Sequence, residues 1–231
     1  MSEPYYGNRS FAKTYCELVS REDYEQNLLP AILEISSLQD KEILELGAGT
    51  GRVSCLIAPL VRKLIATDLS YPMLIYGKNN LTSLNLMNWH LSIADHRVLP
   101  FADQIADVVL SGWSFHGVAI DYPKGWQTTL EQALNEIARV QRPGGITILI
   151  ESLGTGYETP HTPAVLVDYL DYLDSHGFES NWIRTDYLFK DMAEAIDLMT
   201  FFFGDDPMPM WERDMGVIVP ECTGLWWKTF E

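Results

Sequence analysis

The sequence contains only three cysteines among its 231 residues, Cys16, Cys55 and Cys222, and none belongs to a C-x-x-C pair. An odd number of widely spaced cysteines predicts neither a disulfide framework nor a zinc site. The five histidines also lack the close spacing that metal ligands show. The sequence therefore predicts no metal centre.

Long hydrophobic runs are missing as well. The longest apolar stretches, such as residues 146–150 and 201–203, are far shorter than the ~18 residues that span a bilayer. The first four residues include the acidic Glu3 and no basic residue, whereas a secretory leader is basic. We therefore expect a cytosolic protein with no membrane insertion. A hydrophobic content of 47% supports one sizeable core, hence a single domain.

Positive charge is scarce. The chain has 16 Lys and Arg against 32 Asp and Glu, a formal net charge of −16, which predicts repulsion from nucleic acid. Residues 151–231 hold 16 of the acidic residues and only 4 basic ones. This acidic third is either a solvated surface that aids solubility or the mouth of a site for a cationic substrate.

The chain does show an alternation of short apolar segments and helical patterns. Strands are expected over residues 42–46, 63–67, 88–93, 106–111 and 146–152, and helices over 53–60, 73–79 and 126–140. This alternation predicts right-handed βαβ units and a mostly parallel sheet covered on both faces.

The two ends of the chain depart from this alternation. Before the first strand we expect a helix over 21–35, with Ser20 as its N-cap, in an aromatic-rich segment that is either a lid over a pocket or a helix packed on the sheet. The last third predicts a helix over 162–176, a strand over 181–188, a helix over 191–203, a loop over 204–210 and a strand over 223–230. In that last strand Trp226 and Trp227 point to opposite faces, so at least one lies in the core.

The strongest local feature is the run Glu45-Leu46-Gly47-Ala48-Gly49-Thr50-Gly51, in which an apolar strand leads into three alternate glycines that open a helix. Glycine is needed where the backbone turns with positive φ and where a ligand approaches closely. Asp68 follows the next strand, and a carboxylate there accepts both hydroxyls of a ribose. The spacing G-x-G-x-G differs from the G-x-G-x-x-G of dinucleotide sites.

Further motifs extend this pattern: Asp68-Leu69-Ser70-x-x-Met73, Ala94-Asp95 followed by Leu99-Pro100-Phe101, Asp107-Val108-Val109, and Arg142-Pro143-Gly144-Gly145. With these motifs the chain resembles the class I S-adenosylmethionine-dependent methyltransferases, and most of all the small-molecule type related to ubiquinone and menaquinone biosynthesis enzymes. The resemblance covers about residues 41–152. It implies a Rossmann-like, seven-stranded, mostly parallel sheet with helices on both faces and an antiparallel last strand, and S-adenosylmethionine as cofactor.

The resemblance also implies roles for matching residues. The glycines bring the backbone close to the methionine part of the cofactor, and Glu45 orients the loop or reaches the amino group through water. Asp68 takes the ribose hydroxyls, and Asp95 accepts from the adenine amine. The expected cofactor-binding residues are Glu45, Gly47, Ala48, Gly49, Gly51, Asp68, Leu69, Met73, Ala94, Asp95, His96, Ser111 and Trp113.

The segment after the fourth strand departs from the family. Many relatives carry an apolar run ending in paired histidines, whereas this chain reads Ser111-Gly112-Trp113-Ser114-Phe115-His116-Gly117. Trp113 is expected to wall the methyl-transfer site. His116 is the candidate general base, or else a histidine satisfied within the loop, and His161 is a second candidate base. The expected substrate-binding residues are Tyr6, Tyr15, Trp113, His116 and Tyr157.

These observations predict transfer of a methyl group from S-adenosylmethionine to an oxygen or nitrogen atom of a small-molecule acceptor. Alternatives are another transferase that uses the same cofactor site, or a non-catalytic protein that binds the cofactor or a partner. Within the single domain 1–231 we expect an N-terminal helical lid (1–40), a cofactor-binding half (41–152) and a substrate-side half (153–231). The acceptor and the oligomeric state are left open.

Overall fold

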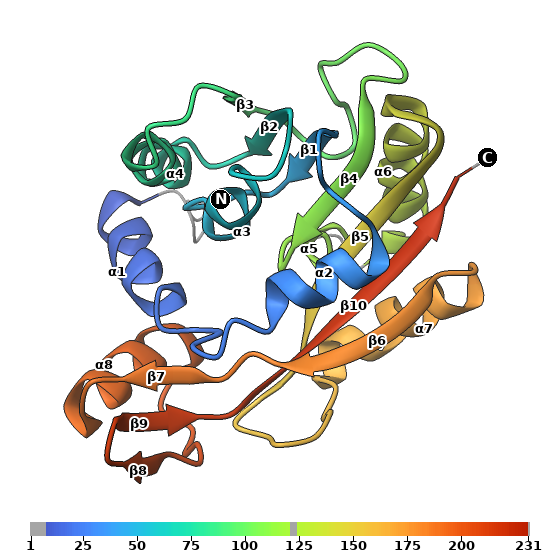
Figure 1. Cartoon of the computed structure of the whole chain (residues 1–231). Coiled ribbons are helices and arrows are strands. Elements are labelled where there is room, and N and C mark those ends of the chain that lie inside the picture. Colours follow the sequence, from blue (N-terminus) through green and yellow to red (C-terminus); the bar gives the residue numbers. More distant parts are fainter. Residues whose placement is uncertain (1–7, 121–123, 231) are drawn as a thin grey trace.

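The computed structural model describes residues 8–120 and 124–230, and its centre is a seven-stranded sheet of order β3-β2-β1-β4-β5-β10-β6 (Figure 1). The neighbouring strands from β3 to β5 are parallel, whereas β10 runs antiparallel to both β5 and β6. The expected Rossmann-like sheet with an antiparallel last strand is therefore confirmed. The strands are β1 (Glu42–Leu46), β2 (Lys63–Asp68), β3 (Trp89–Ile93), β4 (Ala106–Gly112), β5 (Gln141–Thr155), β6 (Glu179–Arg184) and β10 (Glu221–Thr229).

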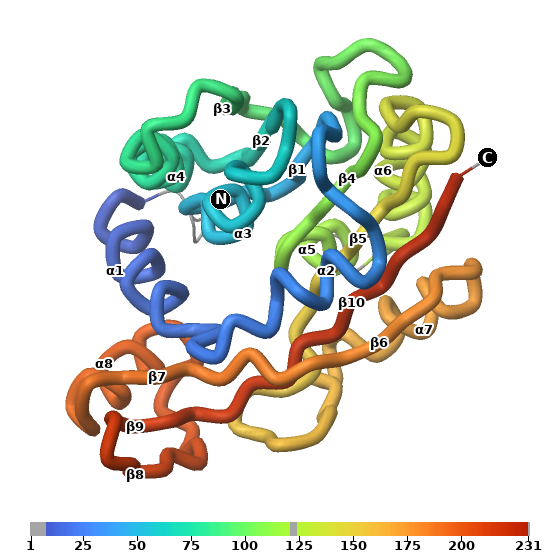
Figure 2. Tube along the Cα trace, in the orientation of Figure 1, coloured from blue at the N-terminus to red at the C-terminus, as the bar shows by residue number. Residues whose placement is uncertain are grey.

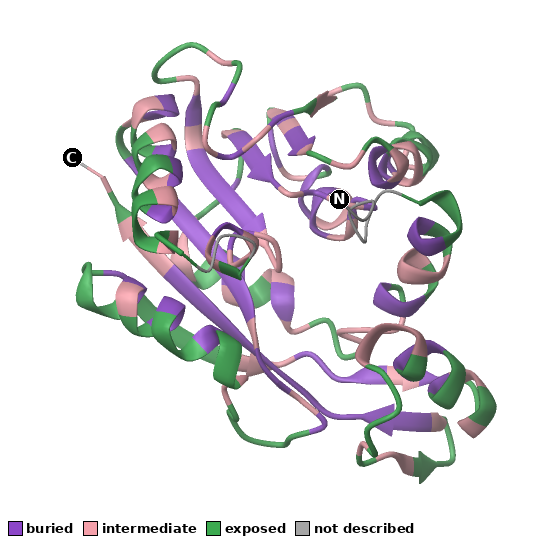
Figure 3. Ribbon diagram, turned by 180° about the vertical axis from the view of Figure 1, so that it is seen from behind, coloured by how far each residue is buried: buried purple, intermediate pink, exposed green. Residues whose placement is uncertain are grey.

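Alternating side chains of the strands form two cores, one on each face of the sheet. In β4, Val108 packs in one core and Val109 in the other, as the period of two requires. Trp226 and Trp227 also divide between the two, which confirms that prediction. Figure 3 shows buried strands between helices whose outer faces are exposed. The helices are α2 (Leu28–Ile35), α3 (Arg52–Ile57) and α4 (Tyr71–Ser83) on one face, and α5 (Gly117–Ile120), α6 (Trp126–Val140) and α7 (Val167–Ser175) on the other.

A smaller three-stranded sheet, of order β7-β9-β8, lies beyond the main one (Figure 2). It shares an apolar cluster with the neighbouring helix α8, to which Leu18 of α1 also belongs. Helix α1 in turn contacts α4 of the main layer. We call these elements the cap: α1 (Arg9–Val19), β7 (Tyr187–Phe189), α8 (Met192–Phe203), β8 (Trp211–Arg213) and β9 (Gly216–Val219).

The helix expected over 21–35 is confirmed only from Leu28 to Ile35, and its first half is wrong, because α1 ends at Val19 with Ser20 as its C-cap and α2 begins only at Leu28. Asp23 and Gln26 between them have positive φ angles of 58° and 61°, which interrupt a helix. The Asp23 carboxylate accepts hydrogen bonds from the N–H groups of Asn27 (2.8 Å) and Leu28 (3.1 Å). A side chain thus satisfies the first N–H groups of α2.

The single strand expected over 181–188 is also wrong. β6 pairs with β10 in the main sheet, whereas β7 pairs with β9 in the cap. Asp186 lies between the end of β6 and the start of β7. Its carboxylate accepts hydrogen bonds from the N–H of Glu221 (3.0 Å) and from the guanidinium of Arg184 (2.7 Å). The helix expected over 162–176 divides into a 3-10 turn, Ala164–Leu166, and α7. Strands β8 and β9 were not expected from the sequence.

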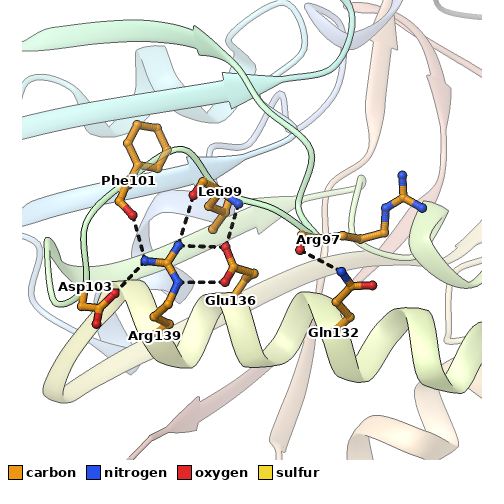
Figure 4. A network of polar contacts seen from close by, with 7 residues as sticks. All are labelled: Arg97, Leu99, Phe101, Asp103, Gln132, Glu136 and Arg139. Carbon is orange, nitrogen blue, oxygen red and sulfur yellow. Dashed lines mark hydrogen bonds and ion pairs between the residues drawn. The ribbon is translucent and has the colours of Figure 1, made fainter.

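The loop after β3 is tied to α6 by Arg139 (Figure 4). Its guanidinium donates to the carbonyls of Leu99 (3.1 Å) and Phe101 (2.8 Å) and pairs with the carboxylates of Glu136 and Asp103, each at 2.8 Å. Glu136 also accepts from the N–H of Leu99 at 2.7 Å. Over residues 8–120 and 124–230, no helix is long and apolar enough to cross a bilayer.

We expect Arg139→Met to lower the free energy of unfolding by about 1–3 kcal/mol, because partly buried carbonyls lose their donors. Urea unfolding measures this change. Arg213→Met, in the exposed strand β8, is the matched control and should change stability by less than about 0.5 kcal/mol. Equal effects of the two substitutions would contradict the assigned role of Arg139.

Candidate cofactor and acceptor site

The chain turns from β1 into α3 within five residues. Gly47, Gly49 and Gly51 adopt φ angles of 69°, 55° and 84°, in the region that side chains disfavour. A Cβ atom on Gly51 would lie 3.3 Å from the Cα atom of Gly77 in α4. The loop therefore needs glycine both for its backbone angles and for its close packing on α4.

Asp68, the last residue of β2, lies beside this loop. Its Oδ2 atom accepts from the N–H of Gly49 (2.8 Å), and its Oδ1 atom accepts from the N–H of Ser70 (2.7 Å). Burial raises the pKa of this carboxyl, while the backbone donors oppose that shift. Because a carboxylate offers about four acceptor positions, Asp68 has capacity for further donors such as ribose hydroxyls.

Glu45 is buried beneath the loop and only 1% exposed. Its carboxyl accepts a hydrogen bond from the hydroxyl of Ser54 in α3. Burial raises the pKa of Glu45 to about 7. The contact joins β1 to α3 across the loop, which fits the first of the two roles expected for Glu45, orientation of the loop.

Asp95 and His96 follow β3 at the same edge of the sheet. The Asp95 carboxylate binds the side chain of Arg97, which holds the pKa of Asp95 below its usual range. The His96 ring is buried, and its Nε2 atom lies 3.2 Å from the hydroxyl of Ser114. Burial lowers the pKa of His96 to about 4, so the ring is neutral near pH 7. Among the described residues its Nδ1 atom has no hydrogen-bond partner.

Ser114 connects the loop after β4 to the glycine loop. A Cβ atom on Gly47 would lie only 1.7 Å from the Ser114 hydroxyl oxygen, so that oxygen fills the space beside the glycine. In Figure 1 the arrowheads of β1, β2 and β4 point to the side of the molecule where α1 lies. The sheet topology and these contacts bring the segments after β1, β3 and β4 together.

Trp113 contacts Arg52, the residue that follows the glycine loop. Its backbone has a φ of 50°, and its N–H donates to the carbonyl of Ile150 (2.7 Å). The Arg52 guanidinium lies 3.4 Å from the centre of the Trp113 ring and forms an ion pair with the buried carboxylate of Glu22. Arg52 thereby joins three segments that are distant in the sequence.

His116 contacts a buried carboxylate of β5. Its Nδ1 atom lies 2.6 Å from one oxygen of Glu151, and its backbone N–H donates to the other oxygen at 3.0 Å. The hydroxyl of Tyr169 also donates to Glu151, at 3.0 Å. The His116 side chain is 27% exposed, whereas Glu151 is fully buried. One partner of the imidazole is thus an interior carboxylate of a neighbouring strand.

The remaining expected cofactor residues lie around the same edge. Leu69 is 62% exposed, an unusual state for leucine, and Met73 is buried with its terminal carbon near Gly49. Ala94 is buried in the core on the α6 side. Ser111 is fully buried, and its hydroxyl has no partner within the described residues.

The expected substrate-binding tyrosines are dispersed. Tyr15 of α1 packs against Phe11 and Phe202 in the cap. Tyr157 is exposed in the loop after β5 and stacks on His161, with ring centres 4.0 Å apart. Tyr6 lies outside the described residues. The described ranges also contain no group of three or more His, Cys, Asp or Glu side chains that could hold a metal ion.

Four residues of this site were not identified from the sequence: Glu22, Gly77, Glu151 and Tyr169. For Glu151 a signal was present, because a single carboxyl ends the apolar run of residues 146–150. For Glu22, no pattern distinguishes it from its acidic neighbours Asp23 and Glu25. Gly77 lacks the positive φ that makes a glycine recognisable in a turn; it is needed because a Cβ there would lie 3.1 Å from the Gly49 carbonyl oxygen.

The architecture is that of known methyltransferases. A crystal structure of an S-adenosylmethionine-dependent methyltransferase from Aquifex aeolicus superposes with a TM-score of 0.59 and 15% identity, covering 95% of this chain and 97% of that one. At this identity the likeness shows the fold alone. The fold of this chain is thus the Rossmann-like fold of such proteins.

The sequence match goes further. Residues 44–149 match the family described as a methyltransferase domain. Malonyl-[acyl-carrier protein] O-methyltransferase 1 of Coxiella burnetii is 26% identical over 74% of this chain and 49% of its own length. Demethylmenaquinone methyltransferase of Clavibacter sepedonicus is 29% identical over 60% of this chain and 50% of its own length. The chain thus spans about half the length of these relatives. Residues 44–149 are thus similar to the methyltransferase domain of these proteins.

The buried imidazole of His96 predicts a specific loss of stability in acid. Its pKa lies near 4 in the folded chain against an ordinary 6.5, so between these values the unfolded chain binds one more proton. Stability therefore falls as the pH falls through this window, by up to about 3 kcal/mol from this group. Relative to wild type, His96→Asn should gain about that amount between pH 7 and pH 4.

Urea unfolding at pH 7, 5.5 and 4 measures this difference. His176→Asn, whose ring is on the surface beside Tyr172, is the matched control and should follow wild type at each pH. Parallel curves for wild type and His96→Asn would contradict burial of a neutral ring.

Proposed function

We propose that this protein transfers a methyl group from S-adenosylmethionine to an oxygen or nitrogen atom of a small-molecule acceptor. One observation carries the proposal: the glycine loop, Asp68 and Asp95 meet at the carboxyl edge of the sheet, and Ser114 and His96 join them to the loop that holds His116. Open α/β sheets bind ligands at this edge. The cofactor supplies an electrophilic methyl group on a positively charged sulfur.

The residues around the loop suit this cofactor. We propose that the backbone of Gly47, Ala48, Gly49 and Gly51 lies against its methionine part, with Ser111 and Trp113 close by and Glu45 orienting the loop. Asp68 holds the ribose, and Asp95, beside the backbone of Ala94 and His96, accepts from the adenine amine. Leu69 and Met73 contact the adenine face. The exposed side chain of Leu69 supports this proposal, because an aromatic base would cover it.

For the acceptor side we propose Tyr6, Tyr15, Trp113 and Tyr157 as contacts and His116 as general base. Residues 1–40 then act as a helical lid, 41–152 as the cofactor-binding half and 153–231 as the substrate-side half. The ion pair of Arg52 with Glu22 supports the role of residues 1–40 as a lid, since it holds the segment before α2 against the start of α3. The net charge of −16 supports a small-molecule partner over nucleic acid.

Incubation with S-adenosylmethionine labelled in its methyl group tests the proposal. The full chain is mixed with a deproteinised metabolite extract, and the expected result is a labelled product together with S-adenosylhomocysteine. A labelled product without S-adenosylhomocysteine would instead favour another transferase that uses the cofactor. Cofactor binding without any product would favour a non-catalytic binding protein.

Asp68→Ala should weaken the binding of S-adenosylhomocysteine by about 2–4 kcal/mol, because two charge-assisted hydrogen bonds are lost in a largely desolvated place. Isothermal titration calorimetry measures the change. Asp168→Ala, at an exposed position in α7, is the control and should bind like wild type. A change below about 0.5 kcal/mol for Asp68→Ala would mean that Asp68 does not hold the ribose.

His116→Ala should lower the turnover number by about 10²–10⁴-fold, because general-base catalysis contributes on that scale. The affinity for S-adenosylhomocysteine should change little, since the ring acts on the acceptor. His161→Ala, in the loop after β5, serves as the comparison and should retain turnover. The opposite ranking of the two variants would transfer the base role to His161.

A further inference from the structure

Glu151 is the fully buried carboxylate behind His116, and it lies outside the proposed cofactor site. Three polar groups surround it: Nδ1 of His116 (2.6 Å), the N–H of His116 (3.0 Å) and the hydroxyl of Tyr169 (3.0 Å). Within the described ranges no Lys or Arg forms an ion pair with it. A buried carboxylate is costly unless hydrogen bonds or a cation compensate it.

The contact determines which nitrogen of His116 can take up a proton. A carboxylate accepts but does not donate, so its neighbour Nδ1 carries the hydrogen and Nε2 carries the lone pair. Hydrogen bonds from Tyr169 and from the His116 backbone hold the carboxylate in place, and the carboxylate in turn fixes the ring. This is the arrangement by which a carboxylate orients a basic histidine and stabilises the imidazolium that forms.

We propose that the acceptor reacts through a hydroxyl group, whose proton passes to Nε2 of His116, and that Glu151, held by Tyr169, is the positioning residue for that transfer. This inference rests on the proposed methyl transfer. In the step, the acceptor oxygen forms a bond to the methyl carbon, and the carbon–sulfur bond breaks with its electron pair left on sulfur. The O–H bond breaks towards Nε2, so the positive charge lost by the sulfonium is regained by the imidazolium.

The other acceptor groups make less use of this pair. A carboxylate acceptor is already ionised, needs no base and would approach a ring backed by the negative charge of Glu151. A neutral amine attacks with its own lone pair and loses its proton only after the new bond has formed. A hydroxyl is a weak nucleophile until its proton is removed, so it gains most from a base at this position.

The first experiment needs no acceptor. Nitrogen NMR of the full chain labelled with ¹⁵N-histidine, recorded at pH 9, reports the tautomer of each of the five histidines, and His116→Gln assigns one of them. We expect the Nδ1–H form for His116, with its ring proton far downfield in wild type and shifted upfield in Glu151→Gln. An Nε2–H form in wild type, or an unchanged proton signal in the variant, would overturn the role of Glu151.

The second experiment identifies the bond in the product. Labelled products from the metabolite extract are treated with mild alkali and, separately, with hot hydriodic acid. A methyl ether resists alkali and releases labelled methyl iodide in the acid, which is the expected result. Release of methanol by alkali reveals an ester and overturns the hydroxyl acceptor, as does label that neither treatment releases. Absence of any product counts against methyl transfer itself, while the NMR result still decides the role of Glu151.

The third experiment compares variants on the identified product. Glu151→Gln should lower kcat by about 10²-fold with KM for the cofactor within about threefold, and Tyr169→Phe should lower kcat by about 3–10-fold. Glu212→Gln, exposed in β8, removes the same charge far from the sheet edge and should leave kcat unchanged. If Glu151→Gln raises only KM, or keeps more than half of kcat, the positioning role is overturned. If Glu151→Gln does not fold, an unchanged kcat in Tyr169→Phe overturns the positioning role instead.

Discussion

The turn between β1 and α3 is the constraint on which the rest of the site depends. Each of its three glycines contacts a different neighbour: Gly47 the hydroxyl of Ser114, Gly49 the carboxylate of Asp68, and Gly51 the backbone of α4. Because all three residues are glycines, the chain adopts positive φ at each of them and passes these neighbours without a Cβ atom. One turn therefore sets the relative positions of the segments after β1, β2 and β4. A side chain at Gly47 would displace Ser114 and one at Gly51 would press on α4, whereas at Gly49 the backbone angle is the obstacle.

The two ends of the sheet differ in how their charges are compensated. At the amino end of β1, Arg142 forms ion pairs with Glu42 and Asp107, and both carboxyls have a lowered pKa. At the carboxyl end, burial raises the pKa of Glu45 and of Asp68, and neither forms an ion pair within the described residues. Asp95 at the same end pairs with Arg97, whereas the carboxyl groups of Glu45 and Asp68, which have no such partner among the described residues, favour a positively charged ligand beside the glycine loop. The charge pattern thus supports the cofactor independently of the glycines.

Much of the sheet was predictable because its strands are short apolar runs bounded by turns. Strand β1 and helix α6 have the expected limits. The failures have local causes. Positive φ angles at Asp23 and Gln26 interrupt a segment whose side chains favour a helix. The change from β6 to β7 depends on pairing with β10 and β9, partners more than 25 residues away that no local pattern reveals. In the candidate site, Asp68 and Asp95 could be named from the sequence because they lie at strand ends, whereas the role proposed for Glu151 depends on its contact with His116.

The residues that match the family model can be compared with the residues outside it that contact them. The matched residues 44–149 include the glycine loop, Asp68, Asp95 and His116, whereas Glu22 and Glu151 lie outside them. Both carboxylates bind residues within the matched range: Glu22 pairs with Arg52, and Glu151 contacts His116. In the proposed function, the matched part of the fold would bind the cofactor, and side chains from the flanking segments would orient the groups that face the acceptor. Segments outside a common core can change without loss of the fold, which makes them the natural location for acceptor specificity.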